Sequence, residues 1–200
     1  MNFDYASIDP RLEILAYLVK PYLEKIGESH GWSHSLEITE FYLIIGMEEK
    51  VDLRIGLAAG LVHDIGLLFG THDNHGILGS LMIDYFLKIA GYKNYERAQI
   101  KHCMATHNFR YEGLEPISGE AKVLVDSDTR CKIGKRSIER AHKHMVETGT
   151  NKKDWARRWT DSRAGLIKKD KIWLTKTGRK MYDDLLRETF GYWEREAEKD

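Results

Sequence analysis

Six histidine and aspartate side chains have residue types that can bind a metal ion. Each of them lies at or near the end of an apolar stretch: His34, His63, Asp64, Asp126, and also His75 and His107. Imidazole and carboxylate groups without thiolate favour iron, manganese, cobalt, nickel or zinc in an open site with nitrogen and oxygen ligands. Helices in a bundle can direct such side chains into one cavity, so we predict a metal site in this chain.

The most informative stretch runs from Ile55 to Val62, where no side chain is polar, and ends in His63-Asp64. In a globular protein such a segment is typical of a helix that other helices cover on every side. A buried carboxylate beside an imidazole needs a fixed partner, and a divalent cation serves both groups. For an isolated His-Asp pair the simpler interpretation is a hydrogen bond that caps a core helix.

Helical periodicity dominates the elements that must position these residues. We expect helices at residues 10–26, 51–68, 94–109 and 120–130, and two more that begin near Ser33 and near His75. One or two basic amphipathic helices are expected within 133–165, and a final helix is expected to be capped by Thr175 or Thr177. No alternating strand pattern and no internal repeat occurs in the sequence. The chain is therefore predicted to be all-α.

Composition limits the class of protein. The 200 residues, 42% hydrophobic and 10% aromatic, suit one domain with a hydrophobic core and exclude disordered and collagen-like chains. No apolar run reaches the roughly 18 residues of a membrane span, and the N-terminus lacks the order of a signal peptide. We therefore expect a cytoplasmic protein with no membrane partner. Cys103 and Cys131 are too few for a disulfide framework and are expected to be buried thiols.

Charge is unevenly distributed although the net charge is zero. Residues 132–180 hold 16 Lys and Arg against 5 Asp and Glu, a balance of +11, whereas residues 1–131 hold 12 against 19, a balance of −7. Such a block is usually a solvated helical face, but a basic wall beside a metal site would attract an anionic substrate. Its Trp155, Trp159 and Trp173 are typical of packing residues, which argues against a nucleic-acid partner.

The ordered set of ligand candidates resembles a known family. His34, then His63-Asp64 29 positions later, then Asp126, in an all-α chain, is similar to the H…HD…D signature of the HD-domain metal-dependent phosphohydrolase superfamily. The sequences around these residues agree as well, over about residues 25–135. The resemblance implies a single-domain helical bundle over 1–200, with the metal-site core at about 25–135 and basic and amphipathic C-terminal helices at 133–200.

The resemblance also implies a function. The chain would hydrolyse a nucleotide or other small phosphate ester with a metal-activated water, and Asp64 would also orient or deprotonate that water. One divalent transition metal ion (Mn, Fe, Co, Ni or Zn) would be held by His34, His63, Asp64 and Asp126, while His75 and His107 would bind a second ion or contact phosphate. The alternatives are an HD-type di-iron oxygenase and a non-catalytic metal-binding regulatory module. A homo-oligomer is left open.

Several positions depart from the family pattern or have other interpretations. Glu37-Ile38 and Leu67 stand where members often have Arg-Val and lysine, so the basic substrate contacts of those members are not expected here. We interpret His30 as a local capping or surface residue. The alternative is a contact with the site, because His30 lies four residues before His34 and could share its helix face. Asp128 is expected to support the region of Asp126, or else to be a helix-terminal charge.

Overall fold

The computed structural model describes residues 5–27, 29–169 and 171–199, and these residues form helices, turns and loops without a strand. The all-α prediction is therefore confirmed. Contacts within the chain divide it into two compact units, Met1–Asp128 and Thr129–Asp200. The prediction of one HD-type domain over the whole chain stays a prediction. In the described part of the chain, no helix combines the length and the apolar character needed to cross a membrane.

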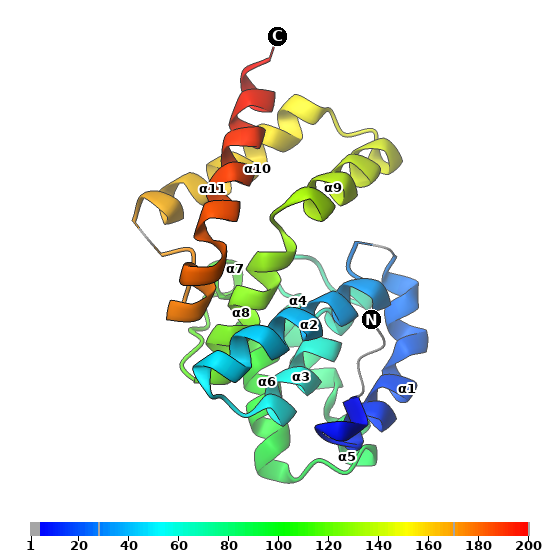
Figure 1. Ribbon diagram of the computed structural model, residues 1–200. Helices are drawn as coiled ribbons and strands as arrows, with labels where there is room; N and C mark the ends of the chain where they lie inside the picture. The colour runs from blue at the N-terminus through cyan, green and yellow to red at the C-terminus, as the bar shows by residue number, and fades with distance from the viewer. Residues whose placement is uncertain (1–4, 28, 170, 200) are drawn as a thin grey trace. The chain divides into compact units, whose positions relative to one another are not determined.

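The first unit is a bundle around one central helix. Its elements are η1 (Tyr5–Ser7), α1 (Arg11–Leu23), η2 (Glu24–Ile26), α2 (Trp32–Glu49), α3 (Leu53–Val62), η3 (Ile65–Leu68), α4 (His75–Met82), α5 (Asp84–Ile89), α6 (Asn94–Thr106) and α7 (Phe109–Glu112), followed by α8 (Gly119–Cys131), which continues to the start of the second unit. Helix α3 packs against α1, α2 and α6 (Figure 1). The apolar stretch of the sequence therefore forms the central helix of this bundle.

Small residues allow α3 to lie so close to its neighbours. A Cβ atom added at Gly56 would stand 1.6 Å from the ring of Tyr42, and one added at Gly60 would stand 3.3 Å from Ile38. At the start of α3, Asp52 caps the helix by accepting a hydrogen bond from the backbone N–H of Arg54. The side chains from Ile55 to Val62 are buried, as predicted.

The predicted helix at 51–68 is interrupted after Val62, which was not expected. Asp64 has backbone angles of φ −94° and ψ 2°, outside the α-helical region, and the chain continues as the short 3-10 helix η3. Gly66 then packs against the first turn of α4, where an added Cβ would stand 2.0 Å from the carbonyl oxygen of His75. This break turns the chain sharply, so that His63, Asp64 and His75 lie near one another.

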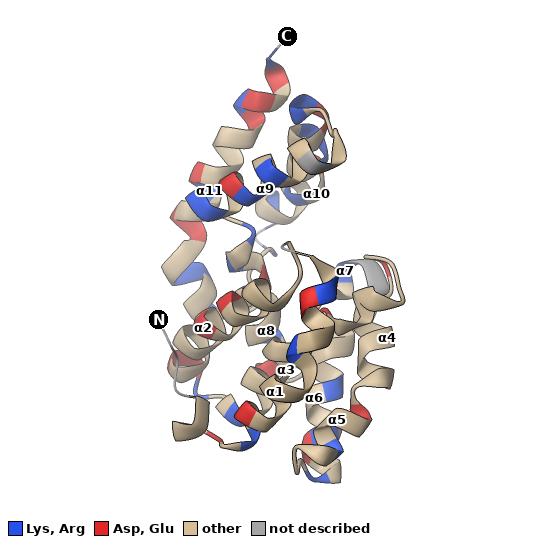
Figure 2. Ribbon diagram, turned by 90° about the vertical axis from the view of Figure 1, so that its right-hand side faces the viewer, with Lys and Arg blue, Asp and Glu red and all other residues tan. Residues whose placement is uncertain are grey.

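The second unit contains α9 (Lys135–Thr148), α10 (Lys152–Lys168) and α11 (Lys176–Glu198). They carry most of the lysines and arginines of the basic stretch at residues 132–180, and α11 continues beyond that stretch (Figure 2). Trp159 and Trp173 are buried in the core of this unit, which confirms that they are packing residues. Thr175 caps α11, because its hydroxyl accepts a hydrogen bond from the backbone N–H of Gly178 at 2.9 Å.

Candidate metal centre

Four helices bring five of the predicted site residues together. His34 lies in the first turn of α2, His63 and Asp64 follow the end of α3, His75 begins α4, and His107 caps the end of α6. Each of these side chains belongs to a residue that is at most 5% exposed. The structure therefore gathers five polar residues in the interior of the first unit.

The carboxylate of Asp64 is the centre of this group. Its Oδ2 atom lies 3.2 Å from Nε2 of His63 and 3.6 Å from Nε2 of His34. Its Oδ1 atom lies 3.0 Å from Nε2 of His75 and 3.6 Å from Nε2 of His107. The two oxygens thus face separate groups of imidazoles, and a carboxylate in such a position can bridge two cations.

Backbone carbonyls determine the tautomer of three of these rings. His63, His75 and His107 each direct Nδ1 at the carbonyl oxygen of the residue three places earlier, at 2.9, 3.0 and 2.6 Å. A carbonyl can only accept a hydrogen bond, so Nδ1 carries the proton in each ring. In the neutral ring, Nε2 therefore presents its lone pair to Asp64. Metal-binding histidines are commonly oriented by such a hydrogen bond.

This arrangement fits a cation and is unfavourable without one. Imidazole lone pairs face a carboxylate, and the Nε2 atoms of His75 and His107 stand only 2.9 Å apart. Within the described residues, both ring nitrogens of His34 and Nε2 of His63 are buried without a hydrogen-bond partner. Ligand atoms in the groups His34, His63, Asp128 and His63, Asp64, His107 lie within 4.8 Å of one another. Imidazole and carboxylate donors at such separations suit a divalent transition metal ion.

The ionisation of the site suits metal binding at neutral pH. Burial lowers the pKa of His34 to about 3, although the charge of Asp64 opposes that effect. For Asp64, burial by itself raises the pKa, but the positive charge that the surrounding imidazoles, His63 first, carry when they are protonated outweighs it and holds the pKa well below its ordinary value. His34 is therefore neutral and Asp64 is ionised near pH 7, and these are the forms that bind metal ions.

Helix α8 carries Asp126, the predicted last ligand, and Asp128, which was expected to support it. Asp126 is fully buried, as a ligand or a supporting residue would be. Asp128 lies with its Oδ1 atom 3.8 Å from Nε2 of His34, and it shares a ligand group with His34 and His63. Residues two apart on a helix point in different directions. The sequence therefore missed the contact of Asp128 with His34, and Asp126 as a metal ligand stays a prediction.

For His30 the alternative interpretation, a contact with the site, is the one that the structure supports. Its Nδ1 atom lies 3.0 Å from Oδ2 of Asp64, so it is neither a capping nor a plain surface residue. The ring of His30 also lies 5.6 Å from that of His34, between ring centres. His30 stands in the turn before α2, so its spacing of four residues from His34 does not place it on a face of that helix. His72 is exposed.

A family model named HD domain matches residues 31–131, which include His34, His63, Asp64 and the two aspartates of α8. The chain belongs to the HD-domain family. This is a superfamily of metal-dependent phosphohydrolases, as the resemblance of the sequence implied. The match begins at Gly31, the residue before α2, and ends at Cys131, the last residue of α8.

Relatives of this HD domain agree with the fold. The Bacillus subtilis (strain 168) protein YpgQ, which is uncharacterized, is 31% identical over 127 residues, or 62% of this chain and 60% of YpgQ. The crystal structure of YpgQ matches with a TM-score of 0.71 at 19% identity, over 94% of this chain and 95% of that chain. YpgQ has also been crystallised in complex with ADP.

A predicted HD superfamily hydrolase from an uncultured Thermotogales bacterium has a similar crystal structure. Its TM-score is 0.68 at 21% identity, over 96% of this chain and 97% of that chain. At these identities the structural matches establish the fold of the chain, whereas the HD-domain match establishes its family.

Proposed function

We propose that this HD-domain chain is a metal-dependent phosphohydrolase that acts on a nucleotide or another small phosphate ester. The observation that carries the proposal is the ionised, buried Asp64, whose oxygens face the lone pairs of carbonyl-oriented imidazoles. His34, His63, Asp64 and an aspartate of α8, Asp126 or Asp128, would hold a divalent transition metal ion. When bound, the ion would polarise a phosphoryl oxygen and lower the pKa of a water molecule.

The residues of the chain then supply orientation and proton acceptance. Asp64 would orient the attacking water and accept its proton at a carboxylate oxygen, within hydrogen-bonding reach. His63 keeps its ring in one orientation through the hydrogen bond to the carbonyl oxygen of Gly60. Because the group is buried, competing bulk water is limited and the charge of each residue acts more strongly.

His75 and His107 would form the second position of the same centre. Both rings direct Nε2 toward Oδ1 of Asp64, the oxygen that the first pair of imidazoles does not use. A second cation held there would share Asp64 with the first. In a two-metal site the attacking and leaving oxygens of a phosphoryl transfer are stabilised together. Without a second cation, these rings would contact the phosphate of the substrate.

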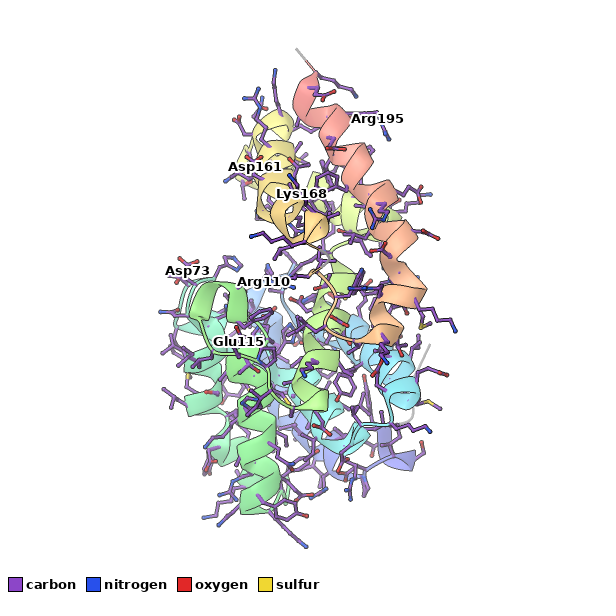
Figure 3. All side chains as sticks on the ribbon, turned by 90° about the vertical axis from the view of Figure 1, so that its left-hand side faces the viewer. Asp73, Arg110, Glu115, Asp161, Lys168 and Arg195 are labelled. Carbon is purple, nitrogen blue, oxygen red and sulfur yellow. The ribbon has the colours of Figure 1, made fainter. Side chains whose placement is uncertain are left out.

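A nucleotide is the substrate class that we favour. The relative YpgQ has been crystallised with ADP, which is a small phosphorylated nucleotide. On this chain, Arg110 of α7 and the loop residue Asp73 lie at the same end of the first unit (Figure 3). Asn108 ties the two segments, since its side-chain amide donates to the carbonyl oxygen of His72 at 2.6 Å. A cationic side chain in this region would suit an anionic phosphate.

The experiment combines metal analysis with hydrolysis. The purified chain is stripped with a chelator, reloaded with manganese, cobalt or nickel, and tested for phosphate or pyrophosphate release from a nucleotide panel. We expect at least one ion per chain and turnover that depends on it. His63→Ala should abolish turnover, whereas His144→Ala, which changes a histidine of the second unit, should not. A His63→Ala variant that loses the ion and stability while the wild type has no turnover would indicate a regulatory module with a structural metal.

The two-sided environment of Asp64 also favours a second candidate, an HD-type di-iron oxygenase. Two iron ions sharing Asp64 would use the same imidazoles, so the ligand set does not separate the two reactions. Iron content and oxygen consumption with reduced iron separate them. Two irons per chain, oxygen uptake and no phosphate release would assign the oxygenase and refute the phosphohydrolase.

A further inference from the structure

His30 makes the shortest contact to Oδ2 of Asp64 among the histidines around that oxygen. Its Nδ1 atom stands at 3.0 Å, against 3.2 Å for His63 and 3.6 Å for His34. His30 lies just before α2, and its side chain is 33% exposed, whereas those of the other two are almost fully buried. His30 therefore joins the buried carboxylate to the surface of the unit.

The ring of His30 is oriented differently from those of His63, His75 and His107. His63, His75 and His107 turn Nε2 inward and hold Nδ1 against a carbonyl oxygen, so their neutral rings cannot donate a hydrogen bond to Asp64. His30 instead turns Nδ1 toward the carboxylate. A neutral ring with its proton on Nδ1 donates that proton to Oδ2. In that tautomer His30 is a hydrogen-bond donor to the carboxylate of Asp64.

The backbone holds His30 in this place. Gly31, the next residue, lies so close to the end of α1 that an added Cβ would stand 2.8 Å from the carbonyl oxygen of Leu23 and nearer still to that of Gly27. Gly27 has φ +96°, a conformation that favours glycine. The turn between α1 and α2 therefore packs closely through Gly27 and Gly31, and this packing fixes the position of His30.

The outer side of His30 meets the segment that carries the second pair of imidazoles. Its ring lies 4.9 Å from that of His72, between ring centres. The carbonyl oxygen of His72 is the acceptor that holds Nδ1 of His75. His30 therefore contacts Asp64 on one side and, on the other, the loop that orients His75.

We propose that His30 is a positioning residue, which holds the carboxylate of Asp64 by a hydrogen bond in the orientation that both ligand pairs share. This inference rests on the proposed function, because it assumes that Asp64 binds a cation. A carboxylate oxygen can accept a hydrogen bond and bind a cation together, so His30 would keep its place when the centre is loaded. Groups that orient metal ligands in this way typically contribute about 10–100-fold to metal affinity.

Two substitutions separate the hydrogen bond from the ring. His30→Asn retains a donor near the place of Nδ1 but removes the ring, whereas His30→Phe retains a ring against His72 but removes the donor. Chelator-stripped proteins are titrated with Co²⁺, and the visible absorption of the bound ion is recorded with the affinity. His144→Phe in the second unit is the matched control, and circular dichroism with thermal unfolding checks that each variant folds.

We expect His30→Phe to weaken Co²⁺ binding about 10–100-fold. His30→Asn and His144→Phe should bind Co²⁺ with an affinity within about threefold of the wild type. All three variants should show the wild-type absorption spectrum of the bound ion. Equal affinity of His30→Phe and wild type would overturn the positioning role. A changed spectrum in His30→Phe and His30→Asn would overturn it too, because His30 would then be a direct ligand. Wild-type protein that takes up no Co²⁺ would refute the metal centre itself, and with it the proposed function.

Discussion

Replacing Asp64 with asparagine tests whether this carboxylate is the shared ligand of the centre. The amide has nearly the same shape but lacks the negative charge that faces the Nε2 atoms of the four imidazoles. A cation that binds only the folded chain stabilises it by about 2.7 kcal/mol when its free concentration is about 100 times its dissociation constant. For a unit the size of residues 1–128 this corresponds to a rise of about 10 °C in the unfolding midpoint. Asp64→Asn should lose most of that rise.

The assay is differential scanning calorimetry of chelator-stripped protein with and without manganese. Asp84→Asn is the control, because Asp84 is an aspartate of the same unit whose side chain is 42% exposed and pairs with Arg97 and Lys101. It should keep the manganese-induced rise of the wild type. If Asp64→Asn keeps the full rise as well, the reasoning from the imidazole lone pairs is refuted, and the cation that stabilises the chain binds elsewhere.

Three further predictions concern other parts of the first unit. Gly66→Ala should destabilise the protein by about 1–3 kcal/mol, because the new Cβ would meet the carbonyl oxygen of His75. If the wild type binds two ions per chain, this variant should bind one; calorimetry measures the stability and metal analysis measures the ion content. The guanidinium of Arg11 donates to Glu96 at 2.8 and 2.9 Å and holds the pKa of Glu96 below its ordinary value of 4.5. That pair therefore contributes stability above pH 4.5, and this stability is lost as the pH falls through the lower pKa that Glu96 has in the folded state. Glu96→Gln should lower the free energy of unfolding in urea by about 2–3 kcal/mol at pH 7, and the difference between variant and wild type should shrink toward pH 3. Burial raises the pKa of Cys103 to about 12, so its thiol should react with a disulfide reagent only on unfolding, and rapid labelling of native protein would contradict this.

The sequence predicted the parts of this fold that depend on composition and periodicity. The apolar residues from Ile55 to Val62 required a covered helix, and α3 is that helix. The placement of His34 and His75 in opening helical turns also followed from periodicity, and both residues lie at the candidate centre. Hydrophobic spacing determines which face of a helix is buried, and so it indicates where the ends of buried helices meet.

Other features depend on contacts between segments that are distant in the sequence. The α-helix ends at Val62 because the chain must turn at Asp64 and pack Gly66 against α4, and no local pattern announces that contact. His30 lies outside a regular helix, so periodicity carried no information about its direction. The proximity of Asp128 to His34 follows from the rotation of α8 about its own axis, which a two-residue spacing leaves open.

The carbonyl-held rings of His63, His75 and His107 have a consequence for the thermodynamics and rate of ion capture. Each ring loses its rotational freedom when the chain folds, so binding an ion does not have to order it again. For three side chains this spares about 2–4 kcal/mol of ordering entropy at the moment of binding. For an ion that binds at this centre, uptake would then depend on diffusion of the ion and the loss of its hydration water, with no rearrangement of these three rings.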